Sequence, residues 1–288
     1  MAEITAKLVK ELRDKTGAGM GDCKKALEAN NGDMETAVQW LRERGAVAAA
    51  KRADREAKEG AIAAAFNNEK TEALLLELNC ETDFVARADD FLKLLNHTAT
   101  LALAHKCNSL EDVLNLNLGA SYDNITASKA VETLVGKIGE KIEFGRYAYI
   151  KSTDGVVVTY IHPGAKLASM ASLSGASNEK TLQLCKDIAM QVAANAPISI
   201  DRTGVTEEML EKEKEVFKQQ ALREGKPEKM MDKIIAGRIE KFYQDVVLLE
   251  QQFFKDNTKA ISDLLKEASD SVGKVEVKSF VRFQLGDR

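Results

Sequence analysis

The sequence predicts an α+β fold: a small unit of three helices, then a core of two similar halves of antiparallel sheet and helix. A protruding antiparallel helical hairpin is expected within the second half. Two apolar strand pairs, starting at Gly60 and Gly155, are each followed by a helical pattern and later by one more strand. Amphipathic helical spacing fills 206–248, with a break at Gly225 and Pro227. Only three prolines occur in 288 residues, so long helices can run without interruption.

Residues 1–45 predict three short helices. The first follows Thr5 and the third follows Asp33, whose side chains can both act as N-caps. Apolar residues such as Leu8 and Leu12 recur at helical steps on one face. A unit of this size has too little core to be stable alone. We therefore expect it to pack on another domain or on a partner.

Residues 46–60 are rich in alanine and charge and predict a solvated linker that is helical in part. Beyond the linker we expect two core subdomains, 61–152 and 153–288. Their predicted strands are 60–66, 71–79 and 141–151 in the first and 155–161, 166–175 and 274–285 in the second; the helices after the strand pairs are 85–105 and 178–194. Each subdomain then forms an antiparallel sheet with helices on one face.

The segment 206–248 is inserted before the last strand. Met209, Val216 and Phe217 are spaced as on one helix, and apolar residues from Met231 to Val246 recur at steps of three or four on the next. Two such helices joined by a tight turn form an antiparallel hairpin. The hairpin can pack on the core or project as a coiled coil, and its dense charge favours projection.

Composition restricts the function classes. A net charge of −4 argues against nucleic acid as the main partner, because phosphate binding needs a basic face. The four cysteines and three histidines are widely spaced, which predicts reduced thiols and no metal site. The N-terminal residues are charged throughout and do not read as a signal peptide, and no apolar stretch is long enough for a membrane helix. We expect a cytoplasmic protein.

Three enzyme hypotheses find little support in the residues. Cys80 lacks a local histidine that could activate a thiol. The glycine-containing stretches match neither a P-loop nor a dinucleotide-binding motif. Glu81 and Asp83 stand two residues apart, a spacing that points their carboxylates in different directions on a helix. We therefore expect a protein that is not an enzyme and has no cofactor.

The junction at 82–85, read as Thr-Asp-Phe-Val, allows two interpretations. Thr82 or Asp83 can cap the helix that follows, and Phe84 can pack into the core. The crowding of two capping residues and an aromatic at the end of an element also suits recognition by a partner. The residues alone leave both interpretations open.

Several long motifs resemble those of bacterial elongation factor Ts. They are LVKELRDKTGAGMGDCKKALEANNGDMETAVQWLR, LNCETDFVARADDF, LVGKIGEKIEF, YIHPGAKL, IAMQVAANAP and GKPEKMMDKIIAGRIEKF, in the family's order over nearly the whole chain. The resemblance implies a guanine-nucleotide exchange factor of elongation factor Tu that has no nucleotide site of its own. It also implies that the three N-terminal helices form a ubiquitin-associated-like domain, and that a two-part core carries a protruding hairpin.

The resemblance implies roles for eight residues. Thr82, Asp83, Phe84 and Val85 match the segment that displaces magnesium from the partner's nucleotide site. The matching partner-binding positions are Arg13, Met20, His162 and Phe254. Two alternatives remain: a scaffold or chaperone-like protein that binds the same GTPase without driving exchange, and a thiol enzyme that uses Cys80.

Overall fold

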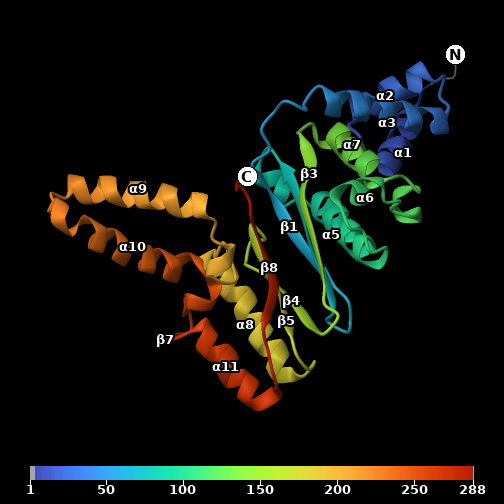
Figure 1. Cartoon of the computed structure of the whole chain (residues 1–288). Helices are drawn as coiled ribbons and strands as arrows, with labels where there is room; N and C mark the ends of the chain where they lie inside the picture. The colour runs from blue at the N-terminus through green and yellow to red at the C-terminus, as the bar shows by residue number, and fades with distance from the viewer. Residues whose placement is uncertain (1–3, 288) are drawn as a thin grey trace.

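The computed structural model describes residues 4–287 and begins with three helices (Figure 1). They are α1 (Ala6–Thr16), α2 (Met20–Ala29) and α3 (Met34–Ala50). Thr5 and Asp33 cap α1 and α3 as predicted, each accepting a hydrogen bond from a backbone N–H three residues on. The small core of this unit consists of Val9, Leu12, Cys23, Ala26, Leu27 and Ala37.

Helix α3 joins the N-terminal helices to the core. It continues to Ala50, so the expected linker begins as helix, and its last turns pack on α7 (Ala127–Ile138). The prediction that this stretch is solvated is wrong for Ala48 and Ala49, which pack on the core. The two helices approach closely where two glycines meet: a Cβ on Gly136 would lie 2.9 Å from the Cα of Gly45.

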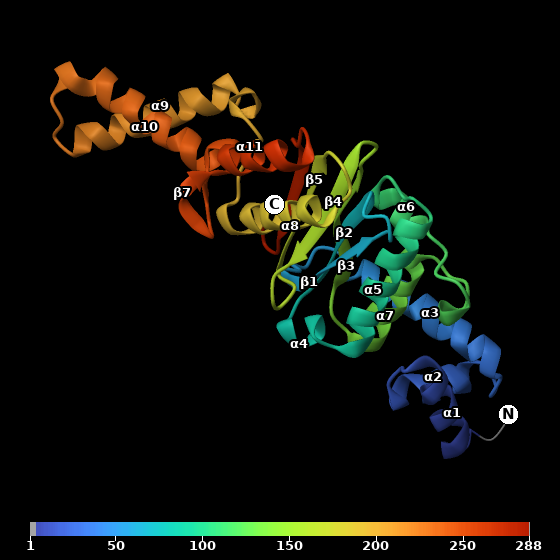
Figure 2. The ribbon, with the colours of Figure 1, turned by 90° about the horizontal axis from the view of Figure 1, so that it is seen from below.

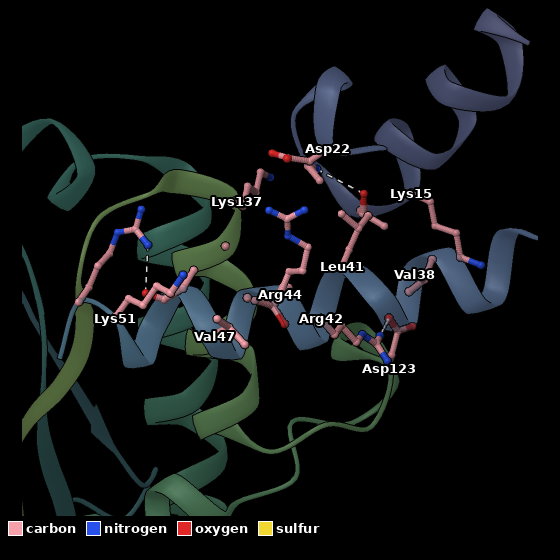
Figure 3. A pocket seen from close by; sticks show the side chains of 17 residues that line it. Lys15, Asp22, Val38, Leu41, Arg42, Arg44, Val47, Lys51, Asp123 and Lys137 are labelled. Atoms are coloured by element: carbon pink, nitrogen blue, oxygen red, sulfur yellow. Dashed lines mark hydrogen bonds and ion pairs between the residues drawn. The ribbon is translucent and has the colours of Figure 1, made fainter. Parts of the chain in front are cut away.

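A cavity of about 520 Å³ lies between α1 and α2 on one side and the packed pair of α3 and α7 on the other (Figure 3). Arg44 and Lys137 extend into it from α3 and α7, and Asp22 faces them from α2. Below the cavity, Arg42 forms an ion pair with Asp123 at 2.6 Å. The three-helix unit thus contacts the core along one continuous helix and through an ion pair.

The two predicted sheets are confirmed. The first contains β1 (Glu59–Phe66), β2 (Glu72–Cys80) and β3 (Ile142–Lys151), and the second contains β4 (Gly155–Ile161), β5 (Leu167–Ser174) and β8 (Val277–Gln284). All neighbouring strands are antiparallel, in the orders β1-β2-β3 and β4-β5-β8. Each sheet therefore has a hairpin followed, much later in the chain, by its third strand.

The two sheets pack face to face, with helices on their outer sides (Figure 2). Helices α5 (Asp89–Ala104) and α7 cover the first sheet, and α8 (Glu179–Asn195) and α11 (Ile261–Val272) cover the second. Every residue of β2 is consequently buried. The shared layer between the sheets contains Ile62, Ala73, Leu75, Ile150, Val157, Ala168, Met170 and Phe283.

The single helix predicted over 85–105 is wrong. The chain forms a one-turn helix, α4 (Asp83–Ala86), then leaves helical geometry at Ala88, whose ψ is 139°, and resumes as α5. Asp89 and Asp90 occupy the first turn of α5, where negative charge complements the helix dipole. The break allows α4 to point in its own direction at the end of the sheet.

The helical hairpin projects from the core, as Figure 1 shows. Its helices are α9 (Glu207–Arg223) and α10 (Met231–Val246). Phe217 meets Phe242 with ring centroids 6.5 Å apart, whereas Met209 and Val216 are exposed and lie off the contact face. The remaining elements are α6 (Leu110–Asn115), β6 (Gln252–Phe253), β7 (Asp256–Ala260) and the short 3-10 turns Ala120–Tyr122, Arg202–Gly204, Glu228–Met230 and Leu248–Glu250. Across residues 4–287, helices are all too short or too polar to cross a membrane.

Candidate functional site

The segment Thr82–Val85 begins at the end of β2, and Thr82 is fixed at that point. Its hydroxyl accepts the N–H of Val85 at 3.4 Å and so caps α4. The same hydroxyl donates to Glu140 Oε1 at 2.7 Å, and the Thr82 N–H donates to Glu140 Oε2 at 3.0 Å. Of the two expected caps, Thr82 is therefore the one used, and Asp83 is the first helical residue.

Glu81, the residue before Thr82, provides a second anchor. Glu81 accepts the backbone N–H of Lys141 at 2.6 Å and pairs with Arg55 at 3.1 Å. These contacts hold the pKa of Glu81 below its ordinary value, mainly through the Lys141 N–H and then through Arg55. The carboxylates of Glu81 and Glu140 thus tie the start of α4 to the turn before β3.

The side chains on the single turn of α4 point to two different sides. Val85 and Ala86 point inward and are buried with the helices that cover the first sheet. Phe84 points outward and is 81% exposed. An aromatic of this size exposed on an anchored turn is unusual, because burial of a phenyl ring is worth about 1.5–3 kcal/mol. The interpretation that placed Phe84 in the core is wrong.

Polar groups flank the exposed ring. Arg87 forms an ion pair with Asp83 one turn earlier and also donates to the Asp83 carbonyl at 3.1 Å. The Arg87 guanidinium carbon lies 6.0 Å from the centre of the Phe84 ring, at the outer limit of a cation–π contact. Asp83 and Arg87 therefore present a paired charge beside an apolar surface.

Cys80 does not have the surroundings of a nucleophile. Its side chain is fully buried and its thiol donates to the Thr82 carbonyl at 3.1 Å. Burial, with the nearby carboxylates of Glu140 and Glu59, raises the pKa of Cys80 to about 12. The thiolate that such catalysis needs is thus disfavoured. Within residues 4–287, no group of three acidic, histidine or cysteine side chains is placed to hold a metal ion.

His162 lies on the exposed turn between β4 and β5. Its Nδ1 is 2.9 Å from the Tyr160 hydroxyl, which orients the imidazole ring. The turn is attached to the first sheet, because Ile62 of β1 donates its N–H to the Ala165 carbonyl at 2.8 Å. Lys166 adds an ion pair with Glu59 at 2.6 Å. The turn and α4 consequently both lie beside the same end of β1.

The other three predicted positions lie on separate elements. Arg13 is exposed on α1, and Met20, at the start of α2, is 45% exposed. Phe254 is 44% exposed in the turn between β6 and β7, where it packs edge-on against Phe253. Figure 2 shows α4 at the edge of the core, with the N-terminal helices to one side and the hairpin to the other.

Two supporting residues were missed from the sequence. Glu140 lies 58 residues from Thr82, and a contact at that separation leaves no local pattern. Arg87 could have been found, because Asp83 and Arg87 have the i,i+4 spacing of a helical ion pair.

Comparison with known proteins agrees with this architecture. A family profile described as Elongation factor TS matches residues 81–287. A protein of Chloroherpeton thalassium named Elongation factor Ts is 53% identical over 289 residues, covering 100% of both chains. Proteins of the same name from Chlorobium phaeobacteroides and Chlorobaculum parvum are 51% and 50% identical over 287 residues, covering 99% of this chain and 100% of theirs. The chain therefore belongs to the elongation factor Ts family.

Proposed function

We propose that this protein binds the GDP-bound form of elongation factor Tu and promotes GDP release, by displacing the magnesium ion from the partner's nucleotide site. It makes and breaks no covalent bond, so it is not an enzyme, and it acts in the cytoplasm on a protein partner. The observation that carries the proposal is the exposure of Phe84 on an anchored turn.

Phe84 acts as a wedge. A ring that is 81% exposed in the free protein gains its burial energy only when a partner covers it. Because Thr82 is held by Glu140, the ring enters the partner from a fixed direction and little conformational entropy is lost. A packed GTPase domain responds to such an insertion by moving to another discrete arrangement rather than by deforming slightly.

Asp83 is the charged part of the same segment. Magnesium is the largest local charge that holds the phosphates of GDP, so its displacement weakens nucleotide binding directly. Asp83 lies beside the wedge and is half-exposed, and its partner Arg87 is itself exposed. The pair can separate at the interface, which lets the carboxylate act on the groups around the ion.

Exchange follows from a difference in binding energy. The protein must bind nucleotide-free elongation factor Tu more tightly than the GDP complex, and GDP weakens its binding by the same factor. Each difference of about 1.4 kcal/mol changes GDP affinity tenfold. Binding of GTP then releases the factor. The four further positions, Arg13, Met20, His162 and Phe254, supply contacts that hold the complex while nucleotide leaves.

The test is release of labelled GDP from purified elongation factor Tu, with and without this protein, at several magnesium concentrations. We expect faster release with the protein, and a smaller acceleration when magnesium is scarce, because the ion then needs no displacement. If the protein binds elongation factor Tu but leaves the release rate unchanged, it is the non-exchanging scaffold and the proposal is wrong.

A further inference from the structure

An ion pair with a buried carboxylate joins the neighbouring strands β2 and β3 of the first sheet. Glu77 of β2 is 5% exposed, and Arg146 of β3 donates to its Oε2 from Nε at 2.9 Å and from Nη2 at 2.5 Å. Asn79 donates to the other oxygen of Glu77 at 2.8 Å. The carboxylate is thus fully hydrogen-bonded, which is the condition for keeping a charge inside a protein.

The strands are shaped around this pair. The pairing of β2 with β3 shifts register between Leu76 and Leu78, where Glu77 lies. Gly145 stands opposite, and a Cβ there would come within 2.1 Å of the Asn79 side-chain oxygen. Any larger residue at position 145 would collide with the Asn79 side chain, so this position needs glycine.

Arg146 also reaches the second sheet. Its Nη2 donates to the Gln284 carbonyl of β8 at 2.7 Å, and its guanidinium carbon lies 4.6 Å from the centre of the Phe283 ring. Gln284 pairs with Leu167, and the next residue, Leu285, donates its N–H to the Lys166 carbonyl at 2.9 Å. One guanidinium thus links β2, which leads into α4, with β8, the strand that pairs with β5 next to the turn of His162.

We propose that Arg146 and Glu77 are positioning residues that fix α4 relative to the 162–166 turn, so that both meet elongation factor Tu together. This inference rests on the proposed function. When one rigid body makes two contacts, the overall affinity exceeds that of either contact alone, because the second contact forms at a high effective concentration once the first is made. Without the Glu77–Arg146 pair the sheets still pack through their apolar layer, and the turn keeps its Ile62–Ala165 hydrogen bond and its Lys166–Glu59 ion pair to β1. The link through β8 is lost, however, so the separation of the two contact points varies more widely.

The test variant replaces both members, Glu77→Gln with Arg146→Met, so that no charge is left buried without a partner. A matched control is Glu276→Gln with Lys278→Met at the far end of β8, which removes the exposed ion pairs of Glu276 with Lys278 at 3.0 Å and with Lys274 at 2.6 Å. The native cysteines are all buried. A protein that carries both Arg87→Cys and Pro163→Cys can therefore take spin labels selectively at these two positions. Double electron–electron resonance then measures the distance between the label on α4 and the label on the turn in each protein, without elongation factor Tu.

We expect the Glu77/Arg146 variant to unfold cooperatively but to broaden the label distance distribution. In labelled-GDP release, the concentration for half-maximal stimulation rises about tenfold while the maximal rate is retained. The control pair changes neither quantity. An unchanged distance distribution, or a broadened one with an unchanged half-maximal concentration, overturns the inference. If the unaltered protein fails to stimulate release, the proposed function is wrong, and the label distances still decide whether the pair fixes the geometry.

Discussion

Glu140 holds Thr82 with both oxygens of its carboxylate, one on the backbone N–H at 3.0 Å and one on the hydroxyl at 2.7 Å. The hydroxyl also caps α4, so a residue from the turn before β3 fixes the first turn of a helix that follows β2. The direction of Phe84 depends on this contact more than on the helix itself, because a single turn has almost no stability of its own.

Glu140→Gln and Thr82→Val should both weaken exchange through loss of this anchor. Thr82→Val removes the cap and the hydroxyl contact, for an expected loss of about 1–3 kcal/mol in the free energy of unfolding. Thr82→Ser keeps both contacts and serves as the control. Chemical denaturation and labelled-GDP release measure the two effects. A Thr82→Val protein with unchanged stability and exchange would contradict the role of the anchor.

Phe84→Ala should slow stimulated GDP release at least tenfold, which corresponds to a loss of about 1.4 kcal/mol or more of differential binding. The melting temperature should change little, because the ring is 81% exposed and leaves no cavity. Val85→Ala serves as the comparison variant. Val85 is buried, so this change should lower the free energy of unfolding. Equal release rates for Phe84→Ala and the unaltered protein would end the wedge hypothesis.

Asp83→Asn separates capping from electrostatic action. Thr82 is the cap, so the loss of charge at Asp83 should cost only the surface pair with Arg87, about 0.3–0.5 kcal/mol. If Asp83 acts on the magnesium region, GDP release should fall several-fold at unchanged stability. The loss should shrink at low magnesium. An Asp83→Asn protein with full activity would leave Phe84 as the sole acting residue of the pair.

Glu81 predicts a pH dependence of stability. Its pKa is lower in the folded state than the ordinary value of 4.5, so its contribution is complete above that pH and is lost as pH falls through the lowered value. At neutral pH we expect Glu81→Gln to be less stable than the unaltered protein. Denaturation curves measured downward from pH 7 should converge only once the pH has fallen below the lowered pKa of Glu81. Parallel curves at all pH values would mean that the Glu81 charge does not stabilise the fold.

Gly45→Ala tests how closely α3 and α7 must approach. The new Cβ would lie 2.7 Å from the Glu132 carbonyl oxygen, which is backbone and cannot turn away. We expect a loss of about 1–3 kcal/mol. Gly237→Ala is the control, because it lies in α10 with open space around it, and alanine there should stabilise by about 0.5–1 kcal/mol. A stabilised Gly45→Ala protein would show that the helices can separate without cost.

The sheets and the hairpin could be predicted because their signals are local. Strand alternation, turn residues and helical spacing within each segment located β1 to β5, β8, α9 and α10. The domain limits 1–45, 46–60, 61–152 and 153–288 stay predictions, although α3 runs across the first of them as continuous helix.

Less of the candidate site around α4 could be predicted from the sequence. Ala88 ends the first turn by backbone conformation alone, with no glycine or proline to mark the break. The exposure of Phe84 depends on how α4 is anchored, through Glu140 far away in the chain. The face-to-face sheets did leave a signal, the uninterrupted leucines at 74–76, which is the pattern of a strand buried on both faces. That pattern could have been used and was not.

The shared apolar layer makes the two halves of the core depend on each other. Each half, taken alone, would expose a face containing Ile62 and Leu75, or Val157 and Met170, to water. Apolar patches of that kind drive association. A polypeptide with a single half would be obliged to pair with another copy. In the whole chain each half covers the apolar face of the other, so the two sheets do for each other within one polypeptide what a second copy would do for an isolated half.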